Sequence, residues 1–178
     1  MRCATQKKVT VLWTALLLGA SSFLLPQFVL AQRPVLEGAV STGSGMSFGQ
    51  GDGHTVVLQS PMYIDVDIIY ANDERPKIEY VVGFQAELQG RVSAGVVPQL
   101  RFTTGPAVWM VYGLIGCPVV FAPFVMVGAE AGGGFLWRFV PRFGAFAEIV
   151  LDLYFLGNDV AEGAMVQLDA NVGIRLLF

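Results

Sequence analysis

The charged residues of this chain recur at even spacings within stretches that are otherwise apolar. Asp65 and Asp67 stand two residues apart, and Glu148 and Asp152 stand four apart. Even spacing places side chains on the same face of a β-strand, because successive residues point to opposite faces. Carboxylates and guanidinium groups gathered on such faces can do one of two things: conduct ions, or neutralise one another as ion pairs.

A second group of residues has the types found in hydrolases. Ser47, Asp52 and the lone histidine, His54, supply a nucleophile, an acid and a base. No hydrolase motif surrounds them, and one His with one Asp is too small a ligand set for a metal site. We therefore expect His54 to be a solvated loop residue, and we expect no catalysis, no metal and no cofactor.

The glycine run 132–134 is not a phosphate-binding loop, because the Lys and Ser/Thr of that motif do not follow it. A glycine run inside a strand instead favours barrel curvature or close packing of interior side chains.

Alternation of apolar and polar residues predicts seven β-strands. They cover residues 61–71, 77–88, 92–102, 107–116, 119–137, 142–155 and 165–178. An eighth, with a weaker pattern, is expected at 35–48, and an alternative boundary merges 54–60 into the second strand. Turns are expected at 72–76, 103–106 and 138–141, with a tight outer corner at 116–118.

Most predicted strands have one apolar and one polar face, as a membrane barrel requires, whereas 107–116 is apolar on both faces and cannot be oriented by alternation. The charges expected to face the interior, or lumen, are Glu79, Glu87, Arg101, Glu130, Glu148, Asp152, Asp169 and Arg175, together with Asp65 and Asp67. Arg91 and Arg142 are further candidates for ion pairs. An eight-stranded barrel is just wide enough for side chains to fill it. We therefore favour a lumen filled by ion pairs over a solute path, and the acid excess would make any leak prefer cations.

Aromatic residues on the apolar faces are expected to gather at one level of the barrel. They are Tyr70, Tyr80, Phe102, Trp109, Trp137, Phe143 and Phe178. Such a belt is typical of a membrane interface. The alternative is that aromatic residues simply favour strand ends.

The N-terminal residues have the features of a secretory signal peptide. Arg2, Lys7 and Lys8 precede an apolar run over 9–25, and Ala31 supplies a small residue at a cleavage site. We predict a signal peptide at 1–31 and a barrel domain at 32–178; the alternative is an uncleaved anchor. Residues 32–178 hold 8 Lys+Arg and 14 Asp+Glu, a net charge of −6, which argues against nucleic-acid binding.

Cys117 is the one cysteine after this segment. It has no intramolecular disulfide partner there, and it is expected to behave as a small buried or lipid-facing hydrophobe.

The last strand carries the most specific signal. Its even positions from Val166 to Phe178 are all apolar. This strand resembles the closing strand of bacterial outer-membrane β-barrels, and the chain resembles the small barrels of that family, of the OmpA transmembrane-domain and OmpX-like kind. The resemblance implies that Val172, Ile174, Leu176 and Phe178 form the signal read by the barrel-assembly machinery.

The resemblance also implies an all-β, antiparallel, up-and-down transmembrane barrel of about eight strands in the outer membrane of a Gram-negative bacterium. We expect a monomer with a structural or surface role, whose partners are outer-membrane lipid and the assembly machinery. The alternatives are a narrow channel for small or hydrophobic solutes and a soluble periplasmic lipocalin-like binding barrel. An outer-leaflet lipid enzyme is a further one.

Overall fold

The computed structural model of this chain describes residues 35–51, 54–59, 62–71, 77–88, 93–122, 125–157 and 164–178. The predicted signal peptide with its cleavage site at Ala31, the turn at 72–76 and Arg91 lie outside the described residues. No helix in the described part of the chain is long and apolar enough to cross a membrane.

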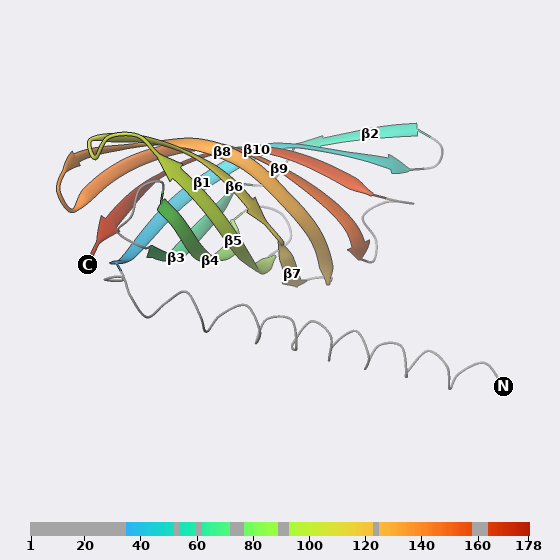
Figure 1. The fold of residues 1–178 in the computed structure, drawn as a ribbon. Helices are drawn as coiled ribbons and strands as arrows, with labels where there is room; N and C mark the ends of the chain where they lie inside the picture. The colour runs from blue at the N-terminus through green and yellow to red at the C-terminus, as the bar shows by residue number, and fades with distance from the viewer. Residues whose placement is uncertain are drawn as a thin grey trace. The chain divides into compact units, whose positions relative to one another are not determined.

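The described residues form one antiparallel sheet that closes on itself (Figure 1). Its strands are β1 (Val35–Gly51), β2 (His54–Gln59), β3 (Tyr63–Ala71), β4 (Lys77–Glu87), β5 (Ala94–Thr104), β6 (Trp109–Gly116), β7 (Val119–Ala122), β8 (Met126–Val140), β9 (Phe143–Gly157) and β10 (Met165–Leu177). β1 pairs with β10 from Glu37 opposite Leu177 to Phe48 opposite Val166, and this pairing closes the barrel. The predicted all-β antiparallel barrel is confirmed.

Ten strands occupy eight positions around the barrel. β2 and β3 both pair with β1, while β6 and β7 both pair with β5 and β8. β2 and the last residues of β1 form a hairpin that extends beyond the rest of the sheet (Figure 1). Residues 54–59 are therefore a strand, as the alternative boundary predicted, and they are separate from β3.

The prediction of a single strand over 119–137 was wrong. The chain reverses between β7 and β8, which run antiparallel with Val119 opposite Val127. Nor is 116–118 an outer corner, because the chain continues there in the same direction from β6 to β7. Pro118 has no N–H and interrupts the ladder, while the Cys117 N–H still donates to the Pro98 carbonyl at 3.1 Å. Both faces are apolar here, so alternation could not locate the reversal.

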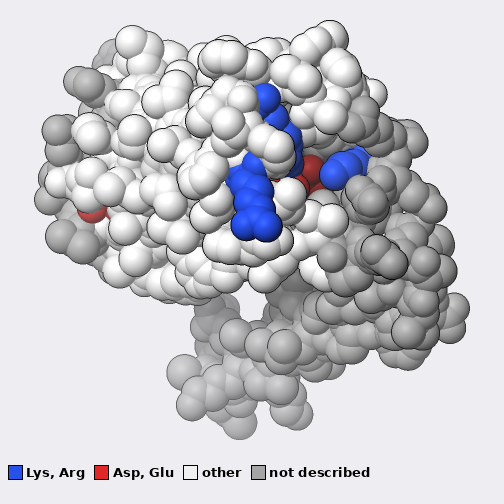
Figure 2. Space-filling model, turned by 90° about the vertical axis from the view of Figure 1, so that its left-hand side faces the viewer, with Lys and Arg blue, Asp and Glu red and all other residues white. Residues whose placement is uncertain are grey.

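The wall of the barrel is apolar outside and mixed inside. In β9 every second residue from Gly144 to Tyr154 is buried, and the residues between them include Ile149, which is 61% exposed. Figure 2 views the side of the molecule that lies at the left in Figure 1, and it shows a largely uncharged surface with Lys and Arg side chains grouped together, acidic atoms beside them and further acidic atoms near the left edge. Large apolar side chains thus face outward over the whole wall.

Outward aromatic residues meet at the end of the barrel that carries the C terminus. Tyr70 pairs with Tyr80 across β3 and β4, and Trp109 pairs with Trp137 across β6 and β8. Phe139 contacts Trp137 edge to face, with ring centroids 5.9 Å apart. These pairs lie beside the turns at this end, so the expected aromatic residues share one level.

We predict that Gly105→Ala destabilises the barrel by about 1–3 kcal/mol. Gly105 opens the turn after β5 with φ of 119°, and a Cβ there would lie 2.9 Å from the Trp109 carbonyl oxygen. Equilibrium unfolding in urea measures the loss. Gly113→Ala is the matched control, because its Cβ would meet no atom closer than 3.9 Å. Equal losses at both positions would contradict the assigned strain.

Candidate functional site

The candidate site is the interior of the barrel, where the polar faces of the strands converge. Of the eight charges predicted to face the lumen, seven are buried and Glu87 is half-buried. Arg142 was also expected to face inward, and that prediction was wrong. β8 ends at Val140 and β9 begins at Phe143, so Arg142 lies exposed in the turn between them.

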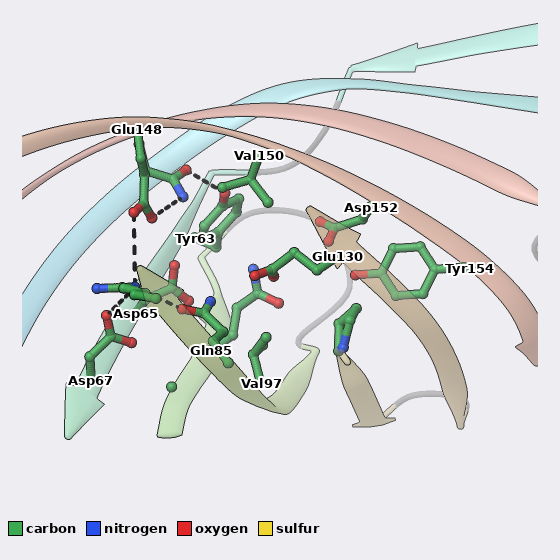
Figure 3. Close-up of a pocket in the computed structure, with 15 residues that line it drawn as sticks. Tyr63, Asp65, Asp67, Gln85, Val97, Glu130, Glu148, Val150, Asp152 and Tyr154 are labelled. Atoms are coloured by element: carbon green, nitrogen blue, oxygen red, sulfur yellow. Dashed lines mark hydrogen bonds and ion pairs between the residues drawn. The ribbon is translucent and has the colours of Figure 1, made fainter. Parts of the chain in front are cut away.

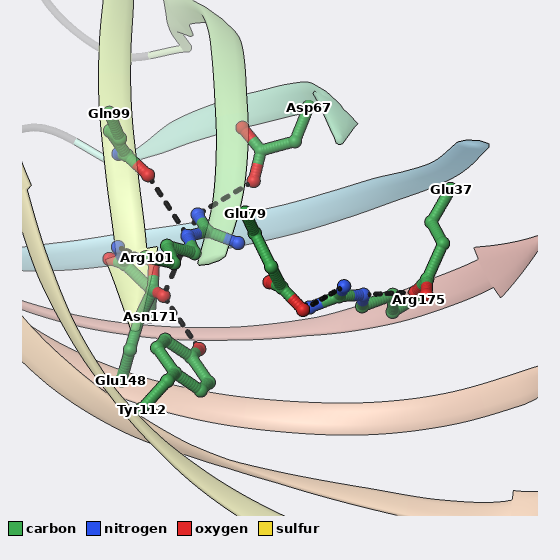
Figure 4. Close-up of polar contacts among 9 residues, drawn as sticks. All are labelled: Glu37, Asp67, Glu79, Gln99, Arg101, Tyr112, Glu148, Asn171 and Arg175. Atoms are coloured by element: carbon green, nitrogen blue, oxygen red, sulfur yellow. Dashed lines mark hydrogen bonds and ion pairs between the residues drawn. The ribbon is translucent and has the colours of Figure 1, made fainter. Parts of the chain in front are cut away.

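One ion-pair network lies in the half of the barrel nearer the C terminus. Arg175 of β10 donates two hydrogen bonds to Glu79 of β4, at 2.9 and 2.8 Å, and a third to Glu37 of β1 at 2.5 Å. Arg138 of β8 donates to both oxygens of Glu37 at 2.8 Å. Figure 4 shows Arg175 spanning the interior between Glu79 and Glu37. The network, which we call the Arg175 network, joins four strands.

A second network, which we call the Arg101 network, surrounds Arg101 of β5. The guanidinium donates to Asp67 of β3 at 2.9 Å and to Gln99 at 3.0 Å (Figure 4). It also lies 3.9 Å from Glu148 of β9 and 5.5 Å from the centre of the Tyr112 ring. This cation is therefore held by two carboxylates and one aromatic face.

Glu148 extends the Arg101 network to further strands. Its two oxygens accept hydrogen bonds from the Tyr112 hydroxyl at 2.8 Å and from the Asn171 amide at 3.0 Å. The Tyr63 hydroxyl donates to Asn171 at 2.5 Å. Gly134 makes room for the Tyr112 ring, since a Cβ at Gly134 would lie 2.5 Å from it. Close packing of interior side chains was one of the two roles expected of this glycine run.

Acidic side chains without an arginine partner line a small interior cavity (Figure 3). Glu130 of β8 lies directly opposite Asp152 of β9 in the register, and both are buried. Glu130 Oε1 and Asp152 Oδ1 have no hydrogen-bond partner among the described residues. The cavity volume is about 20 Å³, which suits one or two water molecules at about 10–15 Å³ each.

Apolar side chains close the interior around these polar groups. Ile69, Leu114 and Leu136 belong to a buried cluster on the strands that carry the two networks. Val120, Tyr154 and Met165 form a second cluster at the opposite end of the barrel from the C terminus. In the described part of the chain, no three His, Cys, Asp or Glu side chains are placed to hold a metal ion. The arrangement neutralises charge inside the barrel and leaves space for water.

Sequence reasoning missed two members of the Arg175 network. Glu37 lies in the weakly patterned first strand, and Arg138 was assigned to a turn. Strict alternation along the first strand could have identified Glu37 as an interior residue, because Ala39 and Ser41 share its face and all three are buried. The same alternation places Arg138 on the inward face with Glu130 and Leu136; it was missed because the predicted strand ended at 137, whereas β8 continues to Val140.

Known proteins resemble this chain in fold and hardly at all in sequence. No family model matches it, and no curated protein matches its sequence. The N-terminal β-barrel domain of Pseudomonas aeruginosa OprF superposes with a TM-score of 0.50 at 12% identity, covering 78% of this chain and 97% of that one. Neisserial surface protein A superposes with a TM-score of 0.53 at 9% identity, covering 80% and 97%. The likeness shows a shared small-barrel fold.

We predict that Arg175→Gln lowers the free energy of unfolding by roughly 3–5 kcal/mol, because it leaves the buried Glu79 carboxylate without its cation. Glu79 would lose its two hydrogen bonds to Arg175. Urea unfolding in neutral detergent measures the loss. Arg142→Gln removes an exposed arginine and should change stability by no more than about 0.5 kcal/mol. Similar values for the two variants would show that the Arg175 network contributes little to stability.

Proposed function

We propose that this protein is an integral outer-membrane β-barrel with a structural or surface role and no catalytic activity. The observation that carries the proposal is the inverted distribution of side chains: the outside is apolar while charges lie inside. Val66, Ile68 and Val172, for example, are about half exposed. In water such a wall would be an aggregation surface. In a bilayer it is the surface that the surrounding lipid requires.

The filled interior favours a structural role over a channel. The Arg175 and Arg101 networks together link eight strands across the lumen. The cavity between these networks and the apolar cluster of Val120, Tyr154 and Met165 is about 20 Å³. A lipocalin-like binding barrel would need a larger interior and a polar outside. Ser47 donates a hydrogen bond to Gln167 at 3.2 Å, which supports a packing role for this residue in place of a nucleophilic one.

The same proposal covers biogenesis and partners. Residues 1–31 would direct export, with cleavage after Ala31. The closing strand would engage the barrel-assembly machinery through its apolar residues Val172, Ile174, Leu176 and Phe178. The mature barrel would be a monomer surrounded by outer-membrane lipid, and its negative net charge argues against a nucleic-acid partner.

The first test is electrophoretic mobility after isolation of outer membranes from expressing cells. We expect the unboiled and boiled protein to migrate differently, because a closed membrane barrel resists detergent until it is heated. The purified barrel in planar bilayers should then give no steady single-channel conductance. A periplasmic protein with no mobility shift would overturn the membrane proposal, and steady conductance would favour the channel.

A charge on the outer wall distinguishes a membrane barrel from a soluble one. Val82 lies near the middle of β4 and is 42% exposed. We predict that Val82→Arg lowers the free energy of unfolding in phospholipid vesicles by about 2–4 kcal/mol, since the guanidinium would sit at mid-bilayer depth. A surface substitution on a water-soluble barrel changes stability by within about 0.5 kcal/mol. A change that small would speak against membrane insertion.

A further inference from the structure

The outer wall of the barrel contains an apolar groove near the C terminus. It has a volume of about 600 Å³ and crosses β3, β1, β10 and β9. Its outward lining includes Leu36, Gly38, Val40, Ile174, Leu176 and Phe178. Gly38 forms a low point between larger neighbours, and the Phe178 ring lies beside it, 3.1 Å from where a Cβ would stand.

Arg142 adjoins one end of this groove, which we call its mouth. Arg142 immediately precedes Phe143, which lines the groove, and its carbonyl accepts a hydrogen bond from the Leu177 N–H at 2.9 Å. Phe178 N–H donates to the Leu36 carbonyl at 3.2 Å, so the ends of β10 and β1 meet this turn. The Arg142 side chain is exposed, and among the described residues no ion pair includes it.

Among the described side chains of this end that are not buried, those that carry charge are basic, and they stand near the C-terminal carboxylate of Phe178. The described basic residues that are not buried are Lys77, Arg138 and Arg142, and all three lie at the end with the C terminus. Figure 2 shows Lys and Arg side chains gathered there on a surface that is otherwise almost uncharged. Glu37 and Glu79, the described acids of this end, are buried and already paired with arginine.

We infer that the groove and Arg142 together form a binding site for one anionic glycerophospholipid of the leaflet at the C-terminal end. A fatty acyl chain lies in the groove, where the lining is apolar, and the phosphate of the headgroup meets the Arg142 guanidinium, which is suited to bidentate phosphate binding. The aromatic belt at the same level marks the interface where headgroups stand. This inference rests on the proposed membrane location.

A second copy of the chain fits this face less well. A symmetric dimer with parallel barrels buries the same patch of both subunits. Such a dimer would bring the two Arg142 side chains to the same level at one interface, where like charges repel. The charge at the mouth of the groove therefore selects an anionic lipid as the occupant.

Native mass spectrometry of the full barrel, released from micelles that contain phosphatidylglycerol or phosphatidylcholine, tests the site. We expect the wild type to retain one phosphatidylglycerol in preference to phosphatidylcholine. Arg142→Gln should lower that preference roughly fivefold, the value of about one basic side chain near an anionic lipid. Lys77→Gln is the matched control, because Lys77 lies at the same end on β4, which contributes no residue to the groove, whereas Arg142 adjoins the groove residue Phe143. Lys77→Gln should leave retention unchanged.

A second pair of variants tests the groove itself. Val40→Trp fills it and should reduce retention of both lipids, whereas Val82→Trp, on an outward position of β4 away from the groove, should not. Equal effects of Arg142→Gln and Lys77→Gln, no lipid preference in the wild type, or a dimer that displaces lipid would each overturn the inference. A barrel that shows the heat-dependent mobility shift but no lipid preference would leave the proposed function standing, and failure to insert into vesicles would end both.

Discussion

The pairing of the first strand with the last is the constraint on which the rest of this structure depends. β1 and β10 pair along almost their whole lengths, and this pairing leaves the main barrel without an open edge. In an apolar surrounding every unpaired backbone N–H and C=O costs several kcal/mol, so only a closed sheet is stable there. Closure also fixes the inside face of each strand, because each register transmits side-chain orientation to the next strand.

Once closure has defined the interior of the barrel, the charged side chains there have to be neutralised without bulk water. Arg101, Arg138 and Arg175 achieve this by each reaching across the interior to carboxylates on other strands. A buried arginine contacts two acids in each of the two networks, so the loss of one cation weakens the compensation of more than one buried charge. The ion pairs of the interior therefore stabilise the closed barrel, which agrees with the proposed structural role.

The surplus of acid in the other half of the barrel follows from the same geometry. Glu130 and Asp152 are opposite one another across β8 and β9, with no arginine among their described contacts. The cavity beside them provides space for water, which can satisfy carboxylate oxygens that the side chains leave unpaired. The outward faces of the strands require no such compensation. The outer wall varies only in shape, because small residues such as Gly38 leave a hollow between branched ones.

The sequence by itself determined the fold class and the interior positions of most charges, because a period of two is a local property that each strand displays independently. It located the strands around Val82 and Ile149, where one face is purely apolar. It failed where both faces are apolar, at the reversal between β7 and β8, and at the end of β8, where the predicted strand stopped before Arg138.

Only the tertiary structure decided which charges meet. Glu37 and Arg175 are 138 residues apart, and Glu79 and Arg175 are 96 apart. Their contacts depend on the register of β1 with β10 and on the width of the closed barrel, which no local pattern encodes. The groove likewise depends on the tertiary structure, because its walls come from four strands. Its mouth comes from the turn that holds Arg142, a residue that alternation along the strand had predicted to face inward.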